Sequence, residues 1–177
     1  QQINIDAALN YMGSTARTLT FVARNDLKVN QSIASSNSTL HVFVKAGDNI
    51  EVASGVSIAS NGGNIVFWAN TDGNNLGNIA VQPTTSIVSN GGGIWMGGGQ
   101  TTTQWVPFEG ATSITVGAAS AISGTANPFG VVIRGAVNAG TGNFYASGVS
   151  NKTGTDYSTG VFFDANSDNI KKKKKNI

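Results

Sequence analysis

The sequence predicts an all-β fold: a right-handed parallel β-helix with three faces and about six rungs. Two recurring patterns support this prediction. In the first, an apolar residue is followed seven positions later by another, with small polar residues and turn formers between them. In the second, two apolar residues flank a single residue, which is the period-two alternation of a short strand with one buried face. Repetition of both patterns along one chain indicates a solenoid.

The seven-residue pattern introduces the longer strands. It joins Ile33 to Leu40, Ile58 to Ile65, Ile87 to Ile94 and Ile122 to Phe129. Alternation predicts one inward-facing column of six strands: Leu19, Phe21 and Ala23; Leu40, Val42 and Val44; Ile65, Phe67 and Ala69; Ile94 and Met96; Phe129, Val131 and Ile133; Val161, Phe163 and Ala165. The steps between these strands are unequal while the alternation is kept, as expected when insertions are confined to the corners of a solenoid.

The second pattern predicts a companion strand in each rung. The pairs are Leu27 and Val29, Ile50 and Val52, Ile79 and Val81, Ile114 and Val116, and Phe144 and Ala146. A small polar residue precedes each pair: Asp26, Asn49, Asn78, Ser113 and Asn143. Such side chains hydrogen-bond the neighbouring backbone in turns, so we expect them to stack as a polar ladder. With three short strands per rung, six rungs at about 4.8 Å make a rod about 30 Å long.

Composition agrees with a solenoid and limits the alternatives. The chain has 177 residues, of which 40% are apolar, enough to fill a narrow core in one domain. Its 23 glycines suit tight turns, and only 11% of its residues are charged. No apolar stripe of helical period is sustained, which argues against a helical fold. Without cysteine, neither disulfides nor thiolate metal sites are available.

The domain is expected to span residues 1–170, followed by a lysine-rich tail over residues 171–177. Residues 168–170 repeat the sequence of residues 48–50, which places Lys172 where Val52 faces the core. Because a lysine cannot continue an apolar core, the solenoid is expected to stop there. We interpret the lysines as a solubilising tail and expect no nucleic-acid partner; an anchor to an anionic surface or nucleic acid is the alternative.

Several segments resemble the filamentous haemagglutinin-like exoproteins that are secreted by the two-partner route. Residues 5–10, IDAALN, are similar to the I-x-A-A-L-N segment of that family. Residues 60–69 and 89–96 resemble its GG-x-I-x-hydrophobic rung, and residues 48–52 resemble its G-x-I-x-V strand. The resemblance covers residues 3–170. It implies a right-handed parallel β-helix, an extracellular location at the outer cell surface of a Gram-negative bacterium, and roles in adhesion, self-association or display of a distal effector.

No catalytic or metal-binding motif is evident in the sequence. His41, the single histidine, alternates with inward residues, so we expect it to face solvent without a partner for metal binding or for a triad. Residues 91–93 and 97–99 lack the Lys-Ser or Lys-Thr of a phosphate loop and are expected to be turn glycines. Asp26 and Asp48 lie near one corner but differ by one position in register, unlike the paired carboxylates of carbohydrate-active β-helices. We therefore expect no catalytic residue, metal or cofactor.

Outward-facing aromatic residues give the best indication of a partner. Two outward columns are predicted: Thr20, His41, Val66, Trp95 and Gly130 in one, and Val22, Phe43, Trp68, Gly97 and Val132 in the other. The apolar members would form a stripe that soluble monomers seldom expose. Either an insertion over residues 97–112 covers this stripe, or the stripe contacts another copy or a neighbouring domain. The predicted contacts for a partner or a cell-surface glycan are Phe43, Trp68, Trp95 and Trp105.

The predicted function is that of a non-enzymatic structural or adhesive segment of a secreted, cell-surface filamentous exoprotein. The segment would act as a stiff rod whose open strand edges favour stacking into filaments. The alternative is a carbohydrate-active or carbohydrate-binding β-helix protein that acts on extracellular polysaccharide. No apolar stretch reaches membrane-spanning length, and Gln1 does not begin a signal peptide, so we expect a mature product or a fragment.

Overall fold

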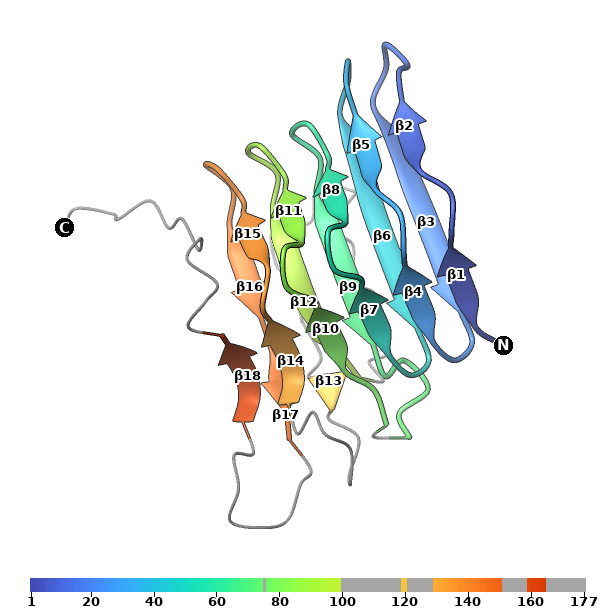
Figure 1. Ribbon diagram of the computed structural model, residues 1–177, viewed down its shortest axis with the longest axis vertical. Helices are drawn as coiled ribbons and strands as arrows, with labels where there is room; N and C mark the ends of the chain where they lie inside the picture. The colour runs from blue at the N-terminus through green and yellow to red at the C-terminus, as the bar shows by residue number, and fades with distance from the viewer. Residues whose placement is uncertain (75, 100–118, 121–128, 151–158, 165–177) are drawn as a thin grey trace, which may run out of the picture.

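The computed structural model describes residues 1–74, 76–99, 119–120, 129–150 and 159–164. These residues form strands and turns, and none of the described segments is a helix long and apolar enough to cross a membrane. Three stacked parallel sheets confirm the predicted three-faced parallel β-helix. In Figure 1 the chain rises along the front strands, returns along the strands behind them and advances to the left, which is a right-handed coil.

Each of the three sheets contributes one strand to a rung, and strands follow one another in chain order. The first sheet contains β1 (Ile3–Ile5), β4 (Leu27–Val29), β7 (Ile50–Val52), β10 (Ile79–Val81), β14 (Phe129–Ile133) and β18 (Thr159–Phe163). The second contains β2 (Leu9–Tyr11), β5 (Ile33–Ser35), β8 (Ser57–Ala59), β11 (Ser86–Val88) and β15 (Ala136–Asn138). The third contains β3 (Arg17–Ala23), β6 (Leu40–Ala46), β9 (Ile65–Ala69), β12 (Ile94–Gly98) and β16 (Phe144–Ala146). A separate short pair joins β13 (Ala119–Ser120) to β17 (Gly148–Val149).

The core is one apolar column that runs through the described rungs. Its members come from the inward positions of all three sheets, and most of them are completely buried. In the first sheet, Leu27 pairs with Ile50 and Ile50 pairs with Ile79, which stacks one apolar side chain on the next. β-branched side chains suit this packing because their χ1 angle is already restricted. The companion strands predicted over residues 27–29, 50–52 and 79–81 are confirmed.

The predicted register of the second rung is wrong. Leu19 pairs with Val42, and Val42 pairs with Ile65, whereas Leu40 lies opposite Arg17. Ile33 pairs with Ile58 and Val42 pairs with Ile65, so the chain uses nine positions from Ile33 to Val42 but seven from Ile58 to Ile65. The apolar residue seven positions after Ile33 therefore comes two positions too early in its strand. Leu40 is nevertheless buried and faces the core, as predicted.

The predicted order of strands after β12 is also wrong. Val131 pairs with Ile79, so β14 belongs to the first sheet and not to the column that contains Leu19. Phe144 pairs with Ile94, which places the predicted companion strand β16 in the third sheet. Val161 pairs with Val131 and thus also belongs to the first sheet. Residues 99–128 separate β12 from β14, and the next strand after them in the three large sheets, β14, belongs to the first sheet. The alternation of apolar residues within a strand does not indicate which sheet the strand joins.

Phe129 does not take the inward position predicted for it, because it packs with Ala80, Val132 and Phe162 in a cluster separate from the core. Phe163 pairs with the core residue Ile133 and packs against Phe144, so it keeps the predicted inward side although it is 40% exposed. The proposed strand over residues 114–116, Ala165 and the proposed tail over residues 171–177 lie outside the described residues. The seven-residue interval instead recurs from Val137 to Phe144, between the second and third sheets.

A repeated Ser-Asn-Gly-Gly turn forms the corner between the second and third sheets. Ser60 and Ser89 are completely buried, and each hydroxyl donates a hydrogen bond to the carbonyl three residues later. The asparagines that follow, Asn61 and Asn90, have φ angles of 50° and 55°, in the left-handed region that asparagine tolerates. The internal hydrogen bond closes the turn without an unsatisfied buried hydroxyl.

The last glycines of these turns allow successive rungs to approach closely. A Cβ atom added to Gly63 would lie 2.1 Å from the carbonyl oxygen of Leu40, and one added to Gly92 would lie 2.1 Å from that of Gly63. Gly142 continues the series, since its Cβ would lie 2.0 Å from the carbonyl oxygen of Gly92. Only glycine fits these positions at the spacing that the parallel ladders impose.

We predict that Gly92→Ala lowers the free energy of unfolding by about 3 kcal/mol, because the new methyl group meets backbone that cannot move alone. Denaturant titration followed by circular dichroism measures the loss. Gly55→Ala is the matched control: Gly55 has a φ of 77° but open space around its Cβ position. That variant is expected to cost about 1 kcal/mol, from backbone strain only. Equal losses in the two variants would contradict the close-approach explanation.

Candidate interaction surface

A ladder of polar side chains follows the corner that precedes the first sheet. Asn49 donates from Nδ2 to Oδ1 of Asp26 over 2.7 Å, and the backbone N–H of Asn78 donates to Oδ1 of Asn49 over 3.0 Å. These bonds confirm the predicted ladder for three rungs. Asn143, which the sequence placed in the same ladder, precedes a strand of the third sheet instead, and Ser113 lies outside the described residues.

A second ladder, which the sequence did not predict, contains the only histidine. The backbone N–H of Asn64 donates to Nδ1 of His41 over 3.0 Å, and the N–H of Gly93 donates to Oδ1 of Asn64 over 2.9 Å. His41 faces outward as expected, but it is half-buried between rungs. Desolvation by burial lowers the pKa of His41, which favours the neutral imidazole that can accept this bond.

Outward aromatic residues form an apolar cluster of their own on the third sheet. Val66, Trp68 and Trp95 are buried, Phe43 packs against them, and the cluster is separate from the core. Trp68 is only 8% exposed and Trp95 only 7%, so most of the predicted stripe is covered within the folded chain. We call these four residues the outer aromatic cluster.

The structure corrects the two outward columns. Phe43 pairs with Val66, Val66 with Trp95, and Trp95 with Tyr145. Phe43 therefore belongs to the first column, in the place that the sequence assigned to His41, and Tyr145 takes the place assigned to Gly130. The neighbouring column contains Val22, Lys45, Trp68 and Gly97. The shift follows from the two extra positions between Ile33 and Val42, compared with their partners Ile58 and Ile65 in the next rung.

Each tryptophan of the outer aromatic cluster has a further contact. Nε1 of Trp68 donates to the carbonyl oxygen of Gly99 over 2.9 Å, and Nζ of Lys45 lies 5.0 Å from the centre of the Trp68 ring, a cation–π contact. Trp95 and Tyr145 are stacked with ring centres 6.1 Å apart and planes 6° apart. Tyr145, which sequence reasoning missed as a surface residue, is 49% exposed. Its strand was expected in another sheet, so nothing linked it to Trp95.

The aromatic stripe was expected either to be covered by the chain itself or to contact another molecule. Strand β13, which lies between β12 and β14 in the sequence, contacts both β9 and β12, the strands that carry Trp68 and Trp95. This contact favours a cover supplied by the chain itself. Trp105 and residues 100–112 lie outside the described residues, so their part in the cover, and the role of all four predicted contact residues, stay predictions.

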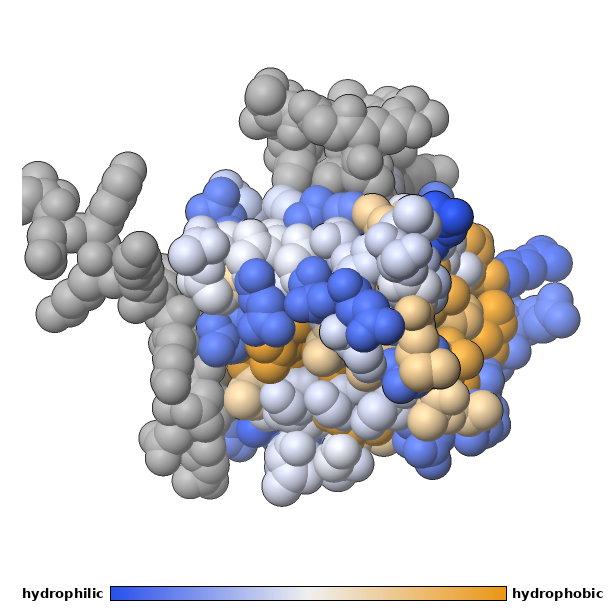
Figure 2. All heavy atoms as spheres, turned by 90° about the horizontal axis from the view of Figure 1, so that it is seen from above, coloured by the Kyte–Doolittle hydropathy of each residue, from blue (hydrophilic) through white to orange (hydrophobic). Residues whose placement is uncertain are grey.

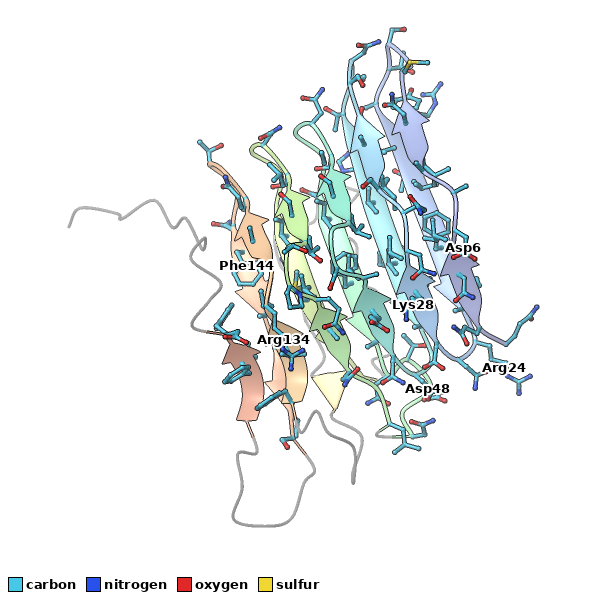
Figure 3. The ribbon with its side chains drawn as sticks, viewed as in Figure 1. Asp6, Arg24, Lys28, Asp48, Arg134 and Phe144 are labelled. Atoms are coloured by element: carbon cyan, nitrogen blue, oxygen red, sulfur yellow. The ribbon has the colours of Figure 1, made fainter. Side chains whose placement is uncertain are left out.

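The carboxylates engage separate partners at the corners. Asp48, labelled at the lower corner in Figure 3, accepts from Nδ2 of Asn74 over 3.0 Å and from Nδ2 of Asn25 over 3.3 Å. Asp26 instead accepts from Asn49 in the ladder described above.

Lys28, on the outer side of β4, forms an ion pair of 3.1 Å with Glu51. Within the described part of the chain, no three metal-ligating side chains come together.

No protein-family model matches the chain, and no curated protein or solved structure matches it at a significant level. The resemblance to filamentous haemagglutinin-like exoproteins, and the cell-surface location that it implies, therefore stay predictions.

We predict that the chain loses stability as the pH falls below about 6.5, the ordinary pKa of histidine. His41 binds its proton at lower pH in the folded chain than in the unfolded one, so the free energy of unfolding is complete above this pH and decreases below it. Protonation also removes the acceptor for Asn64, a hydrogen bond with a net value of about 1 kcal/mol. Denaturant midpoints measured from pH 7.5 to pH 5.5 give the dependence.

The control variant for this experiment is His41→Asn. The Oδ1 atom of the new asparagine can accept a hydrogen bond from the N–H of Asn64, just as Oδ1 of Asn64 accepts one from the N–H of Gly93. Unlike histidine, asparagine does not titrate. The variant is expected to show a flat profile over the same range, since the chain has no other histidine. A profile identical to that of the unmodified chain would rule out His41 as the source.

Proposed function

We propose that the chain is a non-enzymatic structural or adhesive segment of a secreted, cell-surface filamentous exoprotein. It acts as a stiff rod that carries load and presents its corners and outer faces to partners, with self-association through its strand edges. The observation that supports this most directly is the continuous apolar core, enclosed by three parallel sheets. The resemblance noted in the sequence supports the family and the extracellular location.

The rod is stiffened by bonds that run along its axis at the faces and at the corners. The faces contribute the parallel β-ladders, and the corners contribute the Asp26–Asn49–Asn78 and His41–Asn64–Gly93 ladders. The ion pair from Lys28 to Glu51 and the hydrogen bond from Gln82 to Glu51 continue the same pattern on the outer face of the first sheet. Many weak bonds of the same direction resist bending together, which suits a structural element.

A force experiment tests the rod, and a turnover assay tests the enzymatic alternative. The chain has no cysteine, so cysteines placed at Asn4 and Ala136, outward positions of β1 and β15, are its only attachment points. We expect the tethered rod to stay folded at higher load than an α-helical bundle of similar length. Unfolding at a lower load than this bundle would contradict the structural role.

The turnover assay uses polygalacturonate and alginate as substrates, and we expect the chain to leave both uncut. Release of reducing ends that disappears in an Asp26→Asn, Asp48→Asn double variant would favour the enzymatic alternative over the structural role.

Carbohydrate binding is a second candidate function, favoured by one observation. The Tyr145 ring continues the outward column of Phe43, Val66 and Trp95, stacks on Trp95 and is half-exposed. An exposed aromatic ring fixed by stacking offers an apolar face to a sugar ring at low entropic cost.

A glycan array tests this candidate, with Tyr145→Ala as the variant. Loss of one stacking contact of about 1.4 kcal/mol predicts binding that is about tenfold weaker. Val149→Ala is the matched control, because Val149 is also exposed and apolar but belongs to β17, outside the aromatic column. No bound glycan, or an equal loss in both variants, would remove carbohydrate binding through this column.

A further inference from the structure

Each of the two Ser-Asn-Gly-Gly turns contains an Asn-Gly dipeptide, and the sequence has no other. Asn61–Gly62 and Asn90–Gly91 lie in the corner between the second and third sheets, at the upper ends of the strands in Figure 1. Figure 2 views the rod from this side, where hydrophilic and small residues, in blue and pale colours, are gathered. Asn90 and both glycines are exposed and Asn61 is half-buried, so water reaches both dipeptides.

An exposed Asn-Gly dipeptide is a site of spontaneous covalent change. The backbone nitrogen of the glycine loses its proton and attacks Cγ of the asparagine, so that a new C–N bond forms, the bond from Cγ to Nδ2 breaks and ammonia leaves. Water then opens the resulting succinimide at either carbonyl, which gives aspartate or isoaspartate. Glycine permits this attack most readily because it has no Cβ atom beside its nitrogen. The reaction therefore requires a glycine N–H that can lose its proton.

The following rung occupies both of these glycine N–H groups. The N–H of Gly62 donates to the carbonyl of Ser89 over 2.6 Å, and the N–H of Gly91 donates to the carbonyl of Ala139 over 2.9 Å. At such distances no water molecule fits between donor and acceptor. Each nitrogen can lose its proton and attack only after its turn has separated from the next rung, which is a local opening of the fold.

We propose that Asn61 and Asn90 are deamidation sites that the stacked rungs keep closed and that separation of the rungs opens. Ala59 pairs with Val88 in the second sheet, and the next strands continue in the same register, so the two asparagines occupy equivalent positions of adjacent rungs. The inference goes beyond the proposed function and does not depend on it, because it concerns the chemistry of the corner whatever the rod binds or carries.

Deamidation in an opened chain prevents the rungs from stacking again. Isoaspartate carries the main chain through its Cβ atom, which adds one backbone atom to the turn that the Ser60 hydroxyl closes onto the Gly63 carbonyl. The longer turn no longer places Gly63 against the carbonyl of Leu40. Carboxylates at both sites also repel each other across adjacent rungs. An opening that lasts long enough for the reaction is thus recorded irreversibly.

Peptide mass spectrometry of the full chain tests the closed state. The native chain and the same chain in urea are incubated at mildly alkaline pH, and deamidation is measured in the chymotryptic peptides that contain Asn61 and Asn90. We expect deamidation to be at least about a hundredfold slower in the native chain, which corresponds to an opening free energy of about 2.8 kcal/mol. Equal rates in the two conditions would overturn the proposal.

A variant that separates the two turns tests whether the next rung is the protecting element. The Cβ atom of Gly92→Ala would lie 2.1 Å from the carbonyl oxygen of Gly63 and 2.8 Å from that of Gly62. It therefore forces the rungs apart beside Asn61 and leaves the sequence of that turn unchanged. We expect Asn61 to deamidate about tenfold faster in this variant, once circular dichroism shows that it is folded.

Gly55→Ala is the matched control, because its backbone strain lies at a corner between the first and second sheets. It is expected to change the deamidation rate of Asn61 less than Gly92→Ala does, and equal rates in the two folded variants would contradict protection by the next rung. Hydrogen exchange of the Gly62 N–H in the unmodified chain gives a readout that needs no variant. This N–H is expected to show the same protection as Asn61, since both reactions require the same opening, and rapid exchange would overturn the proposal.

Refolding tests whether the modification is irreversible in effect. After partial deamidation in urea, the chain is diluted into buffer and its folded fraction is isolated by size-exclusion chromatography. We expect this fraction to be depleted of isoaspartate at positions 61 and 90. Isoaspartate in the same proportion as in the unfractionated sample would contradict the proposed block to restacking.

Discussion

The structure depends on one constraint: each strand must stay in register with the strand of the rung before it and the strand of the rung after it. Backbone N–H and C=O groups of the inner rungs are removed from water, so each must find a partner in a neighbouring strand. Ile79 illustrates this, since it pairs with Ile50 on one side and with Val131 on the other. The same register stacks apolar side chains into one column, so that hydrogen bonding and core packing are satisfied together.

The corners obey this constraint with side chains in place of strand bonds. Asn49 and Asn64 occupy different corners, yet both accept from the backbone of the next rung. Ser60 and Ser89 close their own turns internally, and the glycines that end those turns let backbone meet backbone. Small residues at the corners are therefore required to keep successive rungs in contact, because a larger side chain would separate the rungs.

Register also decides what the outer faces present. Phe43, Val66, Trp95 and Tyr145 are far apart in the sequence, yet they are consecutive members of one column. Val66 and Trp95 of this column are buried, whereas Tyr145 at its end is half-exposed.

The sequence by itself determined the fold class and most inward positions, since period-two alternation and turn residues are local properties of a strand and its corner. It also indicated the Asp26–Asn49–Asn78 ladder and the aromatic character of one face. Only the tertiary structure decided the register of β6, the sheet that β14 joins and the contact between Trp95 and Tyr145. These depend on how many residues the chain uses between one sheet and the next, and period-two alternation within a strand carries no information on that number.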